Sequence, residues 1–128
     1  MKTLLIGVGA AGNKAVYAAV DSKLFKEEDT IIINSTSKDF PKEYNGNKII
    51  LSPNDTGCGK ERSVAKEYVK IAMKQGKFNI EGIEKYDTII IATSVEGGTG
   101  SGSTPIIAKY FQQVTKKNVH VMAFTGFE

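Results

Sequence analysis

The sequence contains few of the features that mark secreted, membrane-spanning or nucleic-acid-binding proteins. A single cysteine, Cys58, excludes an internal disulfide and leaves too few thiolates for a zinc site, which suits a reducing compartment. No apolar run reaches the roughly 18 residues that would span a membrane. The net charge is only +3 over 128 residues and the lysines are dispersed, so direct binding to nucleic acid is not expected. We therefore expect a cytoplasmic protein.

Short apolar runs alternate along the chain with stretches of helical periodicity. The runs are rich in isoleucine and valine and continuously apolar, which predicts strands buried on both faces of a parallel sheet. The predicted strands are Thr3–Val8, Thr30–Ile33, Lys48–Leu51 (nearest an edge), Thr88–Ala92 and Val119–Phe124. The predicted helices are Asn13–Phe25, Glu61–Gln75 and Pro105–Thr115. This alternation predicts one α/β domain over residues 1–128, a doubly wound, Rossmann-like and mostly parallel sheet in an order of about 3-2-1-4-5, with helices on both faces.

Three glycine-rich loops follow predicted strands, and ligands of doubly wound sheets bind at the carboxyl ends of the strands. The first loop, Gly7–Gly12, has the spacing G-x-G-x-x-G and runs directly into a predicted helix. Its glycines let the backbone approach a phosphate, and the helix start offers free N–H groups and a positive dipole end. The pattern is weak by itself and gains weight from this position. The candidate nucleotide-binding residues here are Gly9, Ala10, Ala11, Gly12 and Asn13.

The second loop, Glu96–Thr104, joins a predicted strand to a predicted helix and contains four glycines. Its backbone can form an anion-holding nest, to which the hydroxyls of Thr99, Ser101 and Ser103 can add donors. A merely flexible linker would rarely be held so tightly between a buried strand and a helix. The candidate nucleotide-binding residues here are Glu96, Gly97, Gly98, Thr99, Gly100 and Ser101.

The third loop, Asp55–Lys60, precedes the second predicted helix. Its last two residues imitate the end of a Walker A motif, but Asn54 stands where that motif needs glycine and Glu61 where it needs serine or threonine. What is left is a loop of small residues that can approach a terminal phosphate. Its candidate residues are Gly57, Cys58 and Gly59.

Together these segments resemble the superfamily of tubulin and its bacterial cell-division homologues, across essentially the whole chain. Gly97–Gly102 resembles the highly specific signature loop GGGTG[ST]G, and Gly7–Gly12 matches the family's first phosphate loop. Gly57–Gly59, followed by Ser63–Ala65, resembles the loop and helix start that sense the γ-phosphate. Ile33–Phe40 looks most like the plasmid- and phage-encoded tubulins, whose filaments segregate or position DNA.

The resemblance implies a protein that binds GTP and GDP, with Mg²⁺ as a cofactor, and whose GTP hydrolysis is coupled to self-association into filaments. It implies a role in DNA segregation, through a DNA-bound adaptor protein, or in cell division. It also adds Asn34 and Glu128 to the implied nucleotide-binding residues.

The chain departs from the family's pattern in sequence and in length. Glu96 stands in place of the first signature glycine, Lys14 in place of an asparagine, and Thr36 where an aspartate near the metal is common. These departures favour a divergent member and leave the metal ligands open. Family members run to several hundred residues, and their central helix and their C-terminal activation domain, with the acidic loop for hydrolysis, lie outside residues 1–128. The implied fragment holds no catalytic residues, binds GTP weakly and does not hydrolyse it.

Two other interpretations stay open. A Rossmann module for NAD or another nucleotide, without GTPase activity, would leave the second loop unused. It would also need an acidic residue at the end of the second strand, where the chain has Asn34–Thr36 and where Asp39 comes too late. A filament or adaptor part that needs no nucleotide would leave all the glycine loops without a role. Outside the loops, His120 is expected in a buried strand as a core or strand-end residue rather than as a catalyst.

Overall fold

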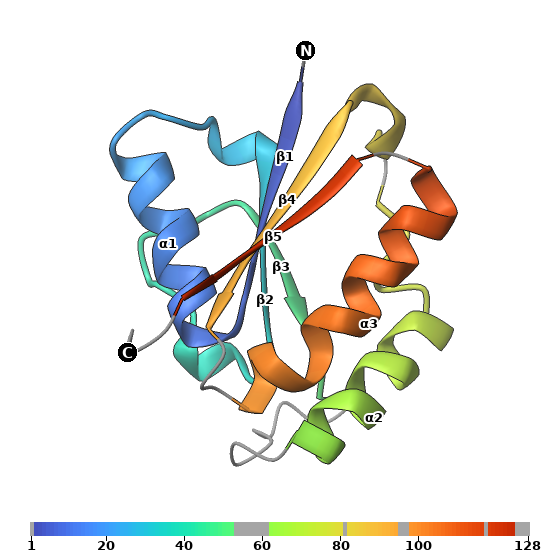
Figure 1. The fold of residues 1–128 in the computed structure, drawn as a ribbon. Coiled ribbons are helices and arrows are strands. Elements are labelled where there is room, and N and C mark those ends of the chain that lie inside the picture. The colour runs from blue at the N-terminus through green and yellow to red at the C-terminus, as the bar shows by residue number, and fades with distance from the viewer. Residues whose placement is uncertain (1, 53–61, 81, 95–97, 117, 125–128) are drawn as a thin grey trace.

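In the described residues, five parallel strands form one sheet in the order β3-β2-β1-β4-β5 (Figure 1). The computed structural model describes residues 2–52, 62–80, 82–94, 98–116 and 118–124. The strands are β1 Thr3–Val8, β2 Thr30–Asn34, β3 Asn47–Ile50, β4 Thr88–Ser94 and β5 Asn118–Phe124. The helices are α1 Gly9–Asp21, α2 Arg62–Lys74 and α3 Gly98–Thr115, and the 3-10 turns are η1 Glu27–Asp29, η2 Ser37–Asp39 and η3 Ile83–Lys85. The predicted fold class and strand order are confirmed.

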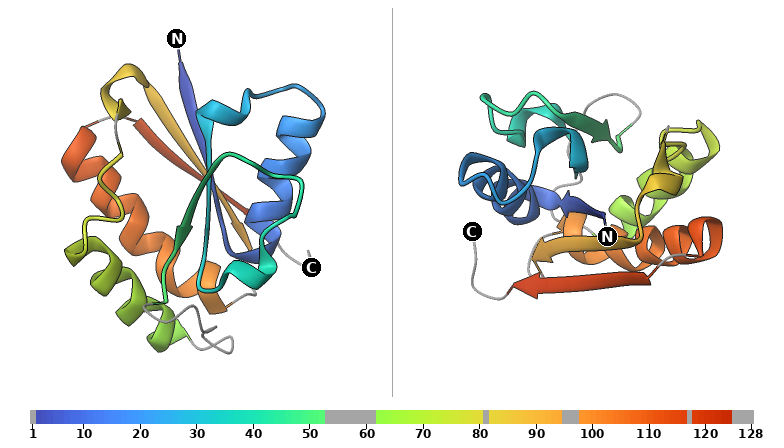
Figure 2. Two further views of the ribbon diagram at one scale, coloured as in Figure 1. Left: turned by 180° about the vertical axis from the view of Figure 1, so that it is seen from behind. Right: turned by 90° about the horizontal axis from the view of Figure 1, so that it is seen from above.

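Helices cover both faces of the sheet, with α1 on one face and α2 and α3 on the other (Figure 2). Because successive side chains of a strand point to opposite faces, β1 divides its residues between two cores. Leu4, Ile6 and Val8 join the cluster that contains residues of α2 and α3, whereas Leu5 packs with Val16 of α1. Burial on both faces explains why the central strands are continuously apolar.

Two helices begin earlier than predicted. α1 begins at Gly9 rather than Asn13, and α3 begins at Gly98 rather than Pro105, which lies inside the helix. The prediction placed these segments in loops because glycine is a poor helix former. In the fold they form first helical turns beside the sheet, so tertiary packing overrides local propensity.

The edge strand β5 is less covered than predicted. His120 is exposed, and Val121 and Met122 keep 47% and 46% of their surface accessible. β5 pairs with β4 along one side only, and Val119 near its start packs against the core that contains α3. The prediction that His120 lies in a strand buried on both faces is therefore wrong. An apolar sequence alone does not tell a central strand from an edge strand.

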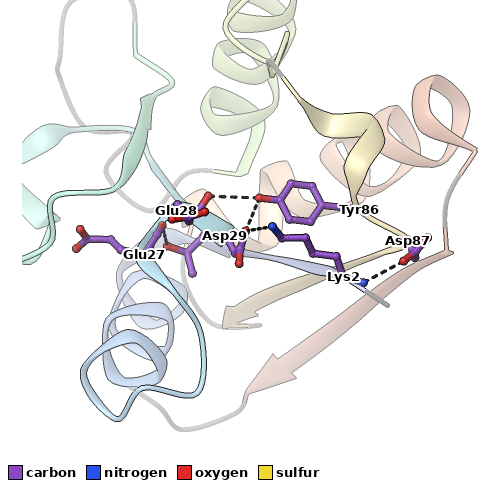
Figure 3. A network of polar contacts seen from close by, with 7 residues as sticks. Lys2, Glu27, Glu28, Asp29, Tyr86 and Asp87 are labelled. Carbon is purple, nitrogen blue, oxygen red and sulfur yellow. Dashed lines mark hydrogen bonds and ion pairs between the residues drawn. The ribbon is translucent and has the colours of Figure 1, made fainter.

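The amino ends of β1, β2 and β4 are joined by a polar network in which Asp29 and Tyr86 are buried (Figure 3). The hydroxyl of Tyr86 donates to Oδ1 of Asp29 at 2.8 Å, and Nζ of Lys2 lies 3.6 Å from the same oxygen. The backbone N–H of Lys2 donates to Oδ2 of Asp87 at 2.9 Å. Burial, reinforced by the Asp29 carboxylate, raises the pKa of Tyr86 above its ordinary value. The network ties the three strands together away from the glycine-rich segments.

Candidate functional site

The two central strands of the sheet end at a topological switch point. β1 and β4 are neighbours with their carboxyl ends in register, Val8 being paired with Thr93. From β1 the sheet grows outward through β2 and β3, and the chain then returns to β4 and continues to β5 on the other side. α1 leaves the end of β1 on one face and α3 follows β4 on the other (Figure 1). The segments predicted as first and second phosphate loops thus contribute to the starts of α1 and α3. Both starts lie at the carboxyl ends of the strands, where doubly wound sheets bind ligands.

The first turn of α1 is pressed against the central strands. A Cβ atom on Gly7 would lie 2.2 Å from the carbonyl oxygen of Gly12, and one on Gly12 would lie 2.3 Å from the carbonyl oxygen of Ala92 in β4. Both positions therefore need glycine for close packing. Gly9 has a φ of +79°, which lets the chain turn from β1 into α1. The structure gives Gly7 and Gly12 a packing role that the spacing of the glycines did not indicate.

Within the described residues, the first turns of α1 and α3 carry no acidic side chain. Val8 is the N-cap of α1 and makes no side-chain cap hydrogen bond, and no residue in the first turn of α1 is acidic. The first turn of α3 contains no acidic residue either. Because the first N–H groups of a helix lack intrahelical acceptors and lie at the positive end of its dipole, both starts are suited to an anion.

The amides of Asn13 and Asn34 join the end of β2 to α1. Nδ2 of Asn13 donates to the carbonyl oxygens of Gly7 at 3.0 Å and Ile33 at 3.1 Å. Nδ2 of Asn34 donates to Oδ1 of Asn13 at 3.1 Å, and Oδ1 of Asn34 accepts from the N–H of Ser35 at 2.8 Å. Both asparagine side chains are almost fully buried. The structure places these two candidate nucleotide-binding residues together, with their amides bonded to protein groups.

The other predicted residues differ in how far the structure describes them. In the first turn of α1, Ala10 is exposed, whereas Gly9, Ala11 and Gly12 are buried. For Gly98, Thr99, Gly100 and Ser101 the structure describes the backbone, which is helical. Outside the described residues lie Gly57, Cys58, Gly59, Glu96, Gly97 and Glu128.

Two hydroxyls of α3 are buried rather than presented at the edge. Ser103, predicted as a donor to the ligand, has no accessible surface. The neighbouring Thr104 is 4% exposed, and its Oγ1 has no hydrogen-bond partner among the described residues. The sequence argument did not single out Thr104, because burial inside a helix is not visible in a run of serines, threonines and glycines.

Neither a metal-ligand cluster nor a membrane span occurs in the part of the chain that the structure describes. No three His, Cys, Asp or Glu residues gather there in a group that could hold a metal ion. No helix in these ranges is long and apolar enough to cross a bilayer.

Comparison with known proteins identifies the family. The model of the Tubulin/FtsZ family, GTPase domain, matches residues 2–127. The chain belongs to the Tubulin/FtsZ family. This confirms the resemblance that the glycine-rich loops carry, and it does not favour an NAD-binding Rossmann module.

Relatives within the Tubulin/FtsZ family include division proteins and phage tubulins. The mitochondrial division protein fszB of Dictyostelium discoideum is 31% identical over 125 residues, which are 97% of this chain and 34% of that protein. The tubulin-like protein TubZ of Clostridium botulinum C phage is 33% identical over 114 residues, 88% of this chain and 31% of that protein. CetZ2 of Haloferax volcanii, solved as a GTPγS-bound protofilament, shares the fold with a TM-score of 0.77 at 22% identity, covering 96% of this chain and 39% of that chain. This chain spans about a third of the length of the curated relatives it matches.

Proposed function

We propose that this chain is the GTP- and GDP-binding domain of a tubulin-like, filament-forming protein. The observation that carries the proposal is the position of two helix starts without acidic residues, those of α1 and α3, at the switch point between β1 and β4. A triphosphate carries several negative charges, and N–H groups from two helices can hold them from both sides. Membership of a GTPase-domain family favours guanine nucleotides over other triphosphates.

The phosphates lie, in this proposal, over the backbone of Gly9–Gly12 and of Gly98–Ser101. Binding is mainly electrostatic, since phosphoryl chemistry depends on positioning and on neutralising charge. Mg²⁺ accompanies the nucleotide, and it typically keeps several waters besides phosphate oxygens and one or two carboxylates. The remaining residues of the proposed site are Gly57, Cys58, Gly59, Glu96, Gly97 and Glu128. Asn13 and Asn34 belong to the site through their bonds to each other and to the strand ends.

A charge placed on the first turn of α1 separates nucleotide binding from folding. Ala10 is exposed there, so Ala10→Glu would place a carboxylate beside the proposed phosphates. The same carboxylate should stabilise the helix by about 0.3–1 kcal/mol, because an acid in the first turn complements the dipole. We expect Ala10→Glu to keep or raise the thermal stability while weakening GTP binding by about tenfold or more, as measured by calorimetry.

The matched control is Ala18→Glu, since Ala18 is exposed on the same helix but eight residues further along. This variant should bind GTP as the wild type does. Equal GTP affinity in wild type and Ala10→Glu would show that α1 does not hold the phosphates. ATP and NAD complete the titration: tight NAD binding without GTP binding would overturn the proposed ligand class. The end of β2 favours GTP here, because Asn34 stands where an NAD site needs an acidic residue.

In the complete protein, GTP hydrolysis is coupled to polymerisation, and the catalytic residues come from the acidic loop of a C-terminal activation domain outside residues 1–128. The filaments act in the cytoplasm, in segregating plasmid or phage DNA through a DNA-bound adaptor or in cell division. Light scattering by the complete protein tests this: scattering that rises with GTP and not with GDP supports it, and scattering that ignores the nucleotide contradicts it.

A further inference from the structure

Asn13 is bonded at the same time to the ends of two strands, β1 and β2, and to the side chain of the last residue of β2. An asparagine amide has two N–H donors, and those of Asn13 go to carbonyl oxygens at the ends of β1 and β2. Its Oδ1 accepts from Nδ2 of Asn34, so these three bonds of the Asn13 side chain are all to protein groups. Asn13 has no accessible surface, and a buried amide left without partners is costly.

The bonds continue from Asn13 into the connection between β2 and η2. Asn34 is the last residue of β2, and its Oδ1 holds the N–H of Ser35 at 2.8 Å. Ser35 and Thr36 are themselves buried, and Oγ1 of Thr36 accepts from the N–H of Lys38 at 3.3 Å at the start of η2. One series of hydrogen bonds therefore runs from Asn13 of α1 through Asn34 to Ser35, and the separate bond between Thr36 and Lys38 follows it along the chain at the start of η2.

We propose that Asn13 is a positioning residue that couples the phosphate-binding turn of α1 to residues 34–39. The inference rests on the proposed function, because it concerns the same site. The Asn13 side chain does not contact the nucleotide. It keeps the start of α1 in register with β1 and β2, so that the free N–H groups of α1 point at one place. Because Asn13 is hydrogen-bonded to Asn34, a nucleotide that orders the start of α1 also orders residues 34–39. The coupling is reciprocal: order in residues 34–39 favours nucleotide binding.

The test compares Asn13→Ala, Asn34→Ala and the double variant with the wild-type chain. The control is Asn118→Ala, since Asn118 is an exposed asparagine on the edge strand β5. GTP affinity is measured by calorimetry. The second measurement is amide hydrogen exchange of residues 34–39 with and without GTP. If Asn13 only stabilised the fold, the effect of GTP on this exchange would not change.

In the wild type we expect GTP to slow exchange in residues 34–39. In Asn13→Ala we expect GTP affinity to fall by about tenfold or more and this GTP-dependent protection to disappear. The double variant should lose no more affinity than Asn13→Ala, because the two residues act in series. If Asn34 instead contacted the nucleotide independently, the two losses would add, and the inference would be wrong.

The proposal is also overturned if a folded Asn13→Ala keeps wild-type GTP affinity and wild-type protection. If Asn13→Ala does not fold, Asn34→Ala decides by itself, since it removes one bond to Asn13 and leaves the two strand-end bonds in place. Its retention of GTP-dependent protection would then refute the coupling. A wild-type chain that binds no GTP would instead refute the proposed function.

Discussion

Gly12→Ala should destabilise the protein, although alanine is a better helix former than glycine. Within a helix the change should be worth about 1 kcal/mol in favour of alanine. Against this, the new Cβ would lie 2.3 Å from the carbonyl oxygen of Ala92 and 3.1 Å from the carbonyl carbon of Gly7, whereas ordinary contact begins at 3.4 Å. Both obstructing atoms belong to the backbone of central strands, so α1 would have to move away by about 1 Å. Overpacking costs about 1–3 kcal/mol, and a clash with two backbone atoms belongs in the upper part of that range. After the gain in helix propensity we therefore expect a net loss of about 1–2 kcal/mol.

The assay is urea unfolding followed by circular dichroism, with the free energy extrapolated to water. The paired variant is Ala18→Gly, at an exposed position of the same helix, where only helix propensity acts and about 1 kcal/mol should be lost. Propensity by itself predicts changes of opposite sign for the two variants, whereas the packing of Gly12 predicts that both are destabilised. A Gly12→Ala protein at least as stable as the wild type would refute the packing role.

Other changes test the core and the polar network by the free energy of unfolding. Tyr86→Phe leaves the buried Asp29 without its 2.8 Å donor and should cost about 1–2 kcal/mol, whereas Tyr17→Phe, at a half-buried position of α1, should cost less than about 0.5 kcal/mol. Phe111→Ala removes a side chain that is 1% exposed and leaves a cavity in the core, so the free energy of unfolding should fall by about 3–5 kcal/mol. Burial raises the pKa of Tyr44 to about 12, so the unfolded chain loses that proton first as the pH rises. About 2–3 kcal/mol of stability, fully present below pH 10, should therefore be lost between pH 10 and 12, and Tyr44→Phe should make this decline smaller.

Much of the fold could be read from local patterns. The isoleucine and valine runs mark strands covered on both faces, and Leu4 and Leu5 show why, since adjacent side chains enter separate cores. Strands alternating with helices imply a parallel doubly wound sheet, because right-handed crossovers leave few other topologies. The same logic predicted that the glycine-rich segments follow the carboxyl ends of central strands, where doubly wound sheets bind ligands.

The errors fall where packing outweighs local preference. Gly98 is a poor helix residue by propensity, yet the first turn of α3 begins there. His120 is flanked in the sequence by apolar residues, but it lies on the edge strand β5 and is exposed. For Asn13, predicted as a nucleotide-binding residue, the sequence did not indicate that its amide is bonded to two strand ends. Such partners are distant in sequence, so no local pattern contains them.

By itself, the sequence determined the class of fold and the family, and it predicted the end of the sheet at which a ligand binds, because periodicity and glycine spacing are local properties that can be read without knowledge of contacts. Only the tertiary structure decided which positions need glycine for close packing, which strand lies at the edge of the sheet, and which groups the amide of Asn13 bonds to. Those properties depend on atoms that are brought within a few ångströms by the crossing of separate segments. Gly12 against Ala92, 80 positions apart in the chain, is the plainest case.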